Sequence, residues 1–106
     1  MLILFDQGVP APLRRSLVGH EIRTAFETGW STLANGDLLA QAESHGFNVP
    51  VTTDRNLGHQ QNLSRRCIAS LALCTTSWPR IQRTTAVILE ALSGLQARAY
   101  VEVEVP

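Results

Sequence analysis

The stretch Leu2-Ile3-Leu4-Phe5-Asp6 decides the fold, because it is a short apolar run that ends in an acidic side chain. Four consecutive apolar residues followed by turn-forming residues are typical of a buried strand. A second run, Val49-Pro50-Val51-Thr52-Thr53, ends in Asp54 in the same way. Because ligands of open parallel sheets bind outside the carboxyl ends of the strands, we expect Asp6 and Asp54 to converge on one cleft.

Strand-like and helix-like stretches alternate outward from these runs, which predicts a single domain over residues 1–106 with an α/β fold and a mainly parallel central sheet. The expected strands cover residues 2–5, 20–25, 48–53, 67–74 and 98–105, and the expected helices cover residues 13–17, 35–45 and 79–93. Residues 26–34 are expected to form a loop, and residues 55–66 a helical turn plus a loop. Pro50 lacks an N–H donor, so its strand is expected to lie at an edge or to begin after the proline. The alternating last strand is expected to be half-exposed and either antiparallel or at an edge.

The composition excludes several classes of protein. All nine basic residues are arginine, so every mechanism that needs a lysine is excluded, P-loop nucleotide hydrolysis included. No apolar run approaches the ~20 residues of a membrane span, and no export signal precedes the first strand, so we expect a cytoplasmic protein without a membrane anchor. Cys67 and Cys74 are expected to be reduced, because seven residues of strand span about 23 Å, beyond the reach of a disulfide.

The chain contains three aspartates, and Asp37 is the third, near the start of the helix expected at 35–45. Clustered carboxylates repel one another unless a cation neutralises them, and oxygen ligands alone suit Mg²⁺ or Mn²⁺. Such an ion can activate water for attack on a phosphodiester. Each acid also has a structural interpretation: Asp6 and Asp54 suit turns, and Asp37 suits the dipole at a helix start.

Four segments carry a family resemblance: LFDQGVP, NGDLLAQAESHGF, VTTDRNLGHQQNL and TTSWPRI. Together they resemble the small bacterial PIN-like proteins of the DUF5615 type, a group related to the toxin nucleases of VapBC toxin–antitoxin pairs. The resemblance extends over nearly the whole chain. It implies a PIN-like α/β/α sandwich with a parallel sheet and an acidic, metal-binding pocket.

By this resemblance, Asp6 and Asp54 match the strand-end acids, and Asp37 matches a helical acid that is more often glutamate in relatives. Asn56 falls where many relatives carry a fourth acid, and Gln7 where they commonly carry glutamate. An amide oxygen can coordinate a metal but adds no charge, so Asn56 predicts weaker Mg²⁺ binding than in those relatives.

Further polar residues are candidates for contacts with nucleic acid. Amide, hydroxyl and guanidinium groups suit phosphate and sugar oxygens, and the candidates are Gln7, Arg14, Gln61, Asn62 and Thr75. The alternatives are a solvated loop for the amides, helix capping ahead of Pro79 for the threonine, and solvated surface for the arginine. Trp30 and Trp78 suit either base stacking or burial as loop plugs.

These observations predict a Mg²⁺- or Mn²⁺-dependent ribonuclease, a hydrolase in which Asp6, Asp37 and Asp54 hold the ion. The resemblance further implies RNA as the substrate, and an antitoxin protein and a second copy of the chain as partners. The alternative is a PIN-like domain that has lost catalysis and acts as a protein-interaction module, which Asn56 and the zero net charge favour. A phosphoacceptor domain like the response-regulator receivers is a third hypothesis, but receivers use a lysine that this chain lacks.

Overall fold

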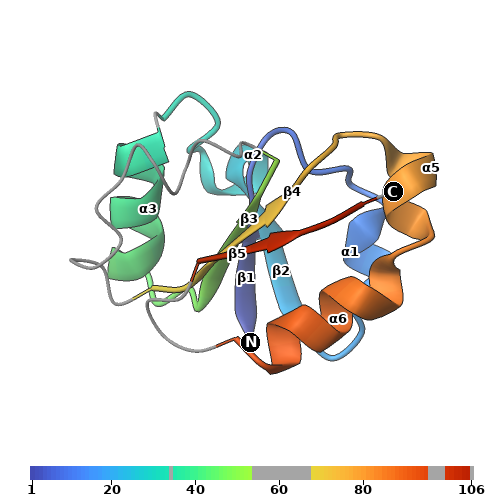
Figure 1. The fold of residues 1–106 in the computed structure, drawn as a ribbon. Coiled ribbons are helices and arrows are strands. Elements are labelled where there is room, and N and C mark those ends of the chain that lie inside the picture. The colour runs from blue at the N-terminus through green and yellow to red at the C-terminus, as the bar shows by residue number, and fades with distance from the viewer. Residues whose placement is uncertain (34, 54–67, 96–99, 106) are drawn as a thin grey trace.

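A computed structural model describes residues 1–33, 35–53, 68–95 and 100–105 of the chain. In these residues a parallel sheet lies between two layers of helices, which confirms the predicted α/β sandwich (Figure 1). The strands are β1 (Leu2–Phe5), β2 (Glu21–Thr24), β3 (Val49–Thr52), β4 (Ser70–Leu73) and β5 (Tyr100–Val103). The helices are α1 (Leu13–Ser16), α2 (Ala25–Thr28), α3 (Asn35–Ser44), α5 (Trp78–Gln82) and α6 (Thr85–Ser93). No helix in these ranges has the length and apolar character to cross a membrane.

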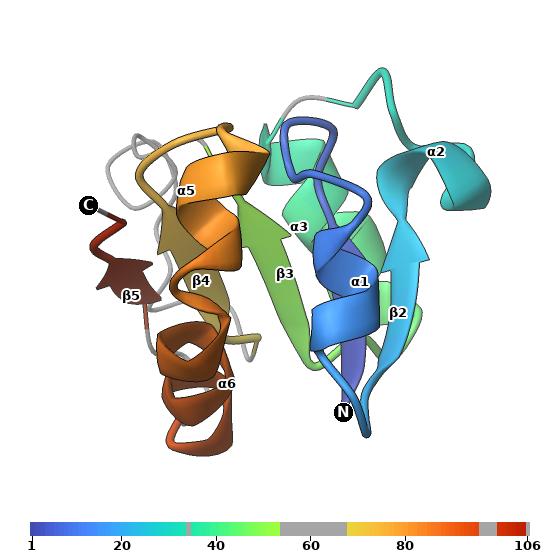
Figure 2. The same cartoon turned by 90° about the vertical axis from the view of Figure 1, so that its right-hand side faces the viewer.

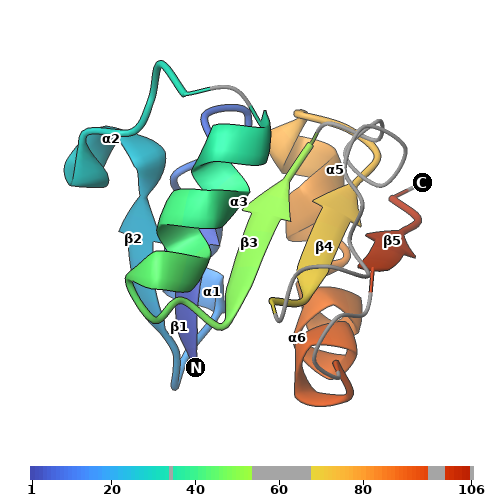
Figure 3. The same ribbon diagram turned by 90° about the vertical axis from the view of Figure 1, so that its left-hand side faces the viewer.

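The five strands run parallel in the order β2-β1-β3-β4-β5. Helices α1, α5 and α6 cover one face of the sheet (Figure 2), and α3 covers the other (Figure 3). The chain leaves β1 in one direction, over α1 to β2, and returns past β1 over α3 to β3. The strand order therefore reverses between β1 and β3, and such a switch point is where open α/β sheets bind their ligands.

The crossovers on the α1 face do not share one hand. The connection from β4 to β5 passes over the same face as the connection from β1 to β2, but it runs in the opposite direction along the sheet. The two crossovers must therefore have opposite hands, and the left-handed one joins β4 to β5 (Figure 2). Most parallel crossovers are right-handed, so this connection is unusual.

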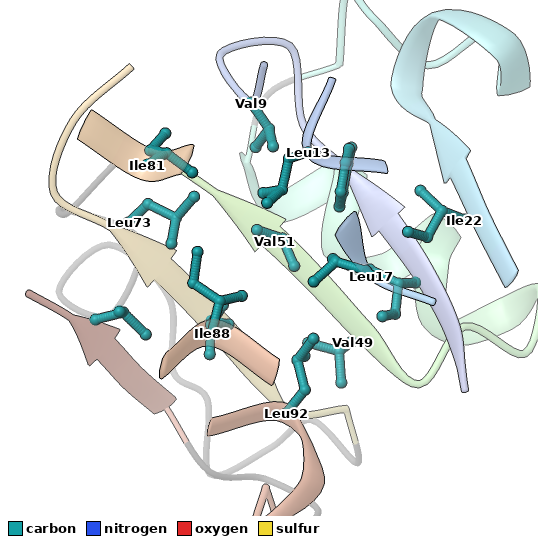
Figure 4. Packing of buried hydrophobic residues seen from close by; sticks show 14 of the residues in the cluster. Val9, Leu13, Leu17, Ile22, Val49, Val51, Leu73, Ile81, Ile88 and Leu92 are labelled. Atoms are coloured by element: carbon teal, nitrogen blue, oxygen red, sulfur yellow. The ribbon is translucent and has the colours of Figure 1, made fainter. Parts of the chain in front are cut away.

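Two apolar clusters hold the layers together, one on each face of the sheet. The larger lies under α1, α5 and α6 and includes the fully buried Leu13, Val51 and Leu73 (Figure 4). The smaller lies under α3, where Leu38, Leu39 and Ala42 face the sheet as their helical spacing predicts. Strand β1 serves both clusters, because successive side chains of a strand point to opposite faces.

The prediction for Pro50 is wrong. Strand β3 begins at Val49 and lies between β1 and β4, so the proline is inside an interior strand. The reason is the register. The carbonyl of Val51 accepts from Asp6 N on the β1 side, so Pro50, one residue earlier, directs its nitrogen towards β4. Pairing with β4 begins only at Val51, and the missing N–H removes no bond from that ladder.

Two helical predictions also need correction. Residues 26–34 were expected to be loop, but α2 occupies Ala25–Thr28. Residues 79–93 were expected to be one helix, but α5 and α6 are separated at Thr84, whose N–H and hydroxyl both donate to the Ile81 carbonyl and end α5. The last strand lies at an edge, as one of the two predictions for it requires, and runs parallel to β4 rather than antiparallel.

Candidate functional site

Asp6 lies immediately after β1, at the switch point between β1 and β3. Its backbone N–H donates to the Val51 carbonyl at 2.9 Å, which extends the ladder one residue beyond the strand. One carboxylate oxygen, Oδ2, accepts from the Thr52 hydroxyl at 2.9 Å, and the other accepts from the Gln7 N–H at 2.7 Å. Asp6 thus lies at the end of a strand, as its place after the apolar run predicted, and its carboxylate bridges the ends of two neighbouring strands.

The two hydrogen bonds leave Asp6 able to bind more. An ionised carboxylate offers about four lone-pair positions, and the bonds from Thr52 and Gln7 use one on each oxygen. Asp6 is partly exposed, whereas Thr52 is 2% exposed, so a buried hydroxyl anchors a carboxylate that reaches solvent. A hard cation or a hydrogen-bond donor is the ligand that such oxygens accept.

The loop after β1 packs closely on the ends of two other strands. A Cβ atom at Gly8 would collide with Oγ1 of Thr53, which follows β3, and would lie 3.6 Å from Cγ2 of Thr76, which follows β4. Only a residue without a side chain fits this approach without a shift. The glycine therefore joins the carboxyl ends of β1, β3 and β4 into one surface beside Asp6.

A hollow of about 220 Å³ opens on the other side of Asp6, towards β2. Its lining includes Asp6 and Gln7 from the loop after β1, and Thr24 and Phe26 from the junction of β2 and α2. The sequence pattern of residues 26–34 predicted a loop, so this second wall, which α2 helps to form, was not expected. The signal was present: Thr24 and Glu27 form a capping box, in which each side chain accepts from the other residue's N–H.

Of the other predicted metal ligands, Asp37 alone lies within the described residues. Asp37 is exposed in the first turn of α3, and that end of α3 lies at the same end of the sheet as the loop after β1 (Figures 1 and 3). Within the described ranges, no group of three or more His, Cys, Asp or Glu side chains comes together. The remaining candidates lie outside the described residues: Asp54, Asn56, Gln61 and Asn62.

Arg14 lies against the edge of the sheet. Its guanidinium donates to the Ile22 carbonyl at 2.6 Å and to Glu27 Oε1 at 2.9 Å. The pKa of Glu27 lies below its ordinary value, chiefly because its carboxylate accepts from the Thr24 N–H and secondly because Arg14 is beside it. The two interactions tie Arg14 to β2 and α2.

The predicted contacts at the start of α5 are mainly structural. The Thr75 hydroxyl oxygen accepts from the Ser77 N–H at 3.1 Å, a local turn rather than a cap on the helix itself. Trp78 begins α5 and packs on the larger apolar cluster, and Trp30 packs on the smaller one with its ring edge-on to Phe47. Both tryptophans are partly buried, which supports their interpretation as plugs.

Comparison of the chain with family models, curated proteins and solved structures finds no match. The function of the site therefore has to be argued from its own residues.

Proposed function

We propose that the protein is a Mg²⁺- or Mn²⁺-dependent ribonuclease of the PIN-like type. The observation that carries the proposal is the partly exposed Asp6 carboxylate, held by Thr52 and Gln7 at the switch point of a parallel sheet. A carboxylate that only completed a turn would need no buried hydroxyl from a neighbouring strand. Asp54 is the next residue after Thr53, which adds a second acid to the end of β3 in sequence.

The donor set suits the ion. Asp6, Asp37 and Asp54 would hold it, with Asn56 as a neutral fourth ligand, and all of these donors are oxygens. When bound, the ion would supply Lewis-acid stabilisation of the phosphodiester and lower the pKa of water. The chain's own contribution is position: Thr52 and the Gln7 N–H fix the direction of the Asp6 oxygens before any ligand arrives.

Further parts of the proposal concern partners and location. A cytoplasmic toxin restrained by an antitoxin protein would fit a small ribonuclease of this type, and a pair of chains is compatible with it. A second candidate function is a PIN-like interaction module without catalysis. The zero net charge favours this candidate, because nucleic-acid binders commonly carry a positive excess.

Calorimetric titration of Mn²⁺ into the wild-type protein, Asp6→Asn and Asp54→Asn tests the proposal. Saturable binding is expected for the wild type, with a loss of more than about 100-fold in each variant, since even outer-shell changes cost 10–100-fold. Glu90→Gln, on α6, is the matched control and should bind as the wild type does. RNA cleavage that requires the metal and Asp6 would support the enzyme. If the wild type binds no Mn²⁺ at millimolar concentrations, the interaction module becomes the better account.

A further inference from the structure

We propose that Phe26 is a stacking platform for one unpaired nucleobase of the RNA, beside the Asp6 carboxylate; this rests on the proposed ribonuclease function. Both residues line the same hollow of about 220 Å³. The substrate class that follows is single-stranded or looped RNA, because only unstacked bases can lie on a protein aromatic ring.

The first observation is the exposure of the ring. Phe26 is 82% exposed, although phenylalanine is among the residues most often found inside proteins. The ring adds nothing to either apolar cluster, so the fold does not account for its presence. Nucleic-acid-binding proteins use exposed aromatic rings in this way, since every base has a face on which it can stack.

The second observation is that Phe26 is held in a fixed relation to Asp6. Phe5 and Thr24 are register partners in the β1–β2 pair, so Asp6 and α2 both follow directly from adjacent, hydrogen-bonded strand ends. The capping box fixes the start of α2, and Gly29, with a φ of 81°, ends it by donating to the carbonyls of Ala25 and Phe26. A short helix that is capped at both ends has a fixed backbone, so the ring is positioned before RNA binds.

The third observation is the size and lining of the hollow. Its volume is below the 300–1,000 Å³ of sites for drug-sized ligands, which suits one ring system better than an apolar segment of a protein. The apolar part of the lining includes Phe5, Val9 and Ala25, and Gln7 and Thr24 supply polar groups. The Gln7 amide carries both donors and an acceptor, which the edge of a base requires. A base in the hollow would lie beside the Asp6 carboxylate.

Fluorescence anisotropy tests the proposal with two labelled oligonucleotides, an eight-residue oligoadenylate and the same backbone with abasic residues, both without divalent metal to prevent cleavage. The wild type should bind the oligoadenylate more tightly than the abasic strand. Phe26→Ala should lose about 5- to 100-fold in affinity for the oligoadenylate and nothing for the abasic strand. Phe26→Tyr should retain the affinity. Val18→Ala is the matched control, because Val18 is 81% exposed and lies in the loop before β2, at the opposite end of the sheet.

Two results would overturn the stacking role and leave Phe26 for a protein partner. One is that the wild type binds the oligoadenylate and the abasic oligonucleotide equally. The other is that the wild type and Phe26→Ala bind the oligoadenylate equally. A separate cleavage assay with Mn²⁺ distinguishes the two proposals. Metal-dependent cleavage that Phe26→Ala does not change would retain the ribonuclease and reject the platform. Base-dependent binding that requires Phe26, without cleavage under any metal, would retain the platform and reject the ribonuclease.

Discussion

At the scale of single residues, the Thr52 hydroxyl is the group that positions Asp6. Thr52→Val keeps the shape of this buried side chain but removes the donor to Asp6 Oδ2. We expect a loss of about 1.5–3 kcal/mol in the free energy of unfolding, as for a hydrogen bond to a charged group, measured by urea denaturation. The exposed Thr32→Val serves as control. If Thr52→Val costs the same stability in an Asp6→Ala background as in the wild type, the hydroxyl does not stabilise the protein through its bond to Asp6.

Gly8 gives a second test at this scale, because an added methyl group would collide with Thr53 Oγ1. Gly8→Ala is expected to destabilise the protein by about 1–3 kcal/mol, the usual cost of overpacking. Thr53→Ala removes the colliding oxygen, so the double variant should recover most of the loss in the same urea experiment. Gly94→Ala is the control, since a Cβ atom added there would lie 3.8 Å from its nearest neighbour, the Glu90 carbonyl oxygen. If the double variant recovers nothing, contact with Thr53 is not the constraint on Gly8.

The position of Asp6 could be predicted from sequence, because an apolar run marks a buried strand and the residue after it must lie at the strand end. Its hydrogen bond with Thr52 could not be predicted. That contact depends on the pairing of β1 with β3, which are separated by more than forty residues in the chain, and no local pattern specifies such a register. The capping box gave a local signal for the helix that carries Phe26, but the hollow itself forms only where the ends of β1 and β2 are adjacent, which no local pattern specifies.

At the scale of elements, β2 is an edge strand that α1 and α2 protect. Arg14 Nη2 covers the outward carbonyl of Ile22, Glu27 covers the Thr24 N–H, and the two side chains pair at 2.9 Å. We name Arg14 and Glu27 the edge clasp. Open strand edges favour pairing with other chains, and charged side chains that cover the edge oppose it.

Removing the clasp should therefore increase self-association. In an antiparallel pair centred on Ile22, Glu21 of one copy lies opposite Arg23 of the other, so the exposed edge is complementary to itself. Sedimentation velocity of Arg14→Ala/Glu27→Ala from about 10 to 200 μM should show more dimer than the wild type. Arg15→Ala, the exposed neighbour on α1, should not. Identical sedimentation of the double variant and the wild type would mean that the clasp does not guard this edge.

The clasp also predicts a pH dependence. Because the pKa of Glu27 is lower in the folded protein, its stabilising contribution is complete above the ordinary glutamate pKa of about 4.3 and is lost as the pH falls through the lower, folded-state value. Wild type should therefore have a higher urea midpoint than Glu27→Gln at pH 7, and the difference should shrink below about pH 4. Glu90→Gln controls for general loss of charge. A difference that stays constant from pH 7 to pH 3 would contradict the assigned role.

Among the elements, sequence patterns identified each of the five strands in the described residues and failed where local chemistry competes with them. The four residues of α2 are too few to show helical periodicity, so only the capping box of Thr24 and Glu27 could have indicated it. The apolar pattern continues through residues 79–93, yet the Thr84 hydroxyl competes for the Ile81 carbonyl and divides the helix. Pro50 suggested an edge strand because a missing N–H normally removes a ladder bond. Only the register of β3 with β4, which begins at Val51, shows that no bond is lost here.

At the scale of the whole molecule, one sheet is shared by two helical layers. The α/β class follows from the alternation of patterns, but the hand of the β4–β5 crossover does not. Sequence fixes neither the face that α5 and α6 cover nor the direction of β5, and the usual preference would have placed these helices with α3. They pack instead beside α1, where Leu13, Ile81 and Ile88 complete the larger cluster.

Because both layers pack on the same strands, they should unfold together. Each layer contains one tryptophan: Trp78 packs on the larger cluster and Trp30 on the smaller one. In Trp30→Phe and Trp78→Phe, the remaining tryptophan reports on one layer alone, and its fluorescence should follow the same urea transition as the circular dichroism of that variant. Leu39→Ala, under α3, should lower the midpoint seen by Trp78 as well as by Trp30, with a cost of about 2–5 kcal/mol. Separate transitions in the two variants would show that β1, although it contributes side chains to both clusters, does not couple them into one cooperative unit.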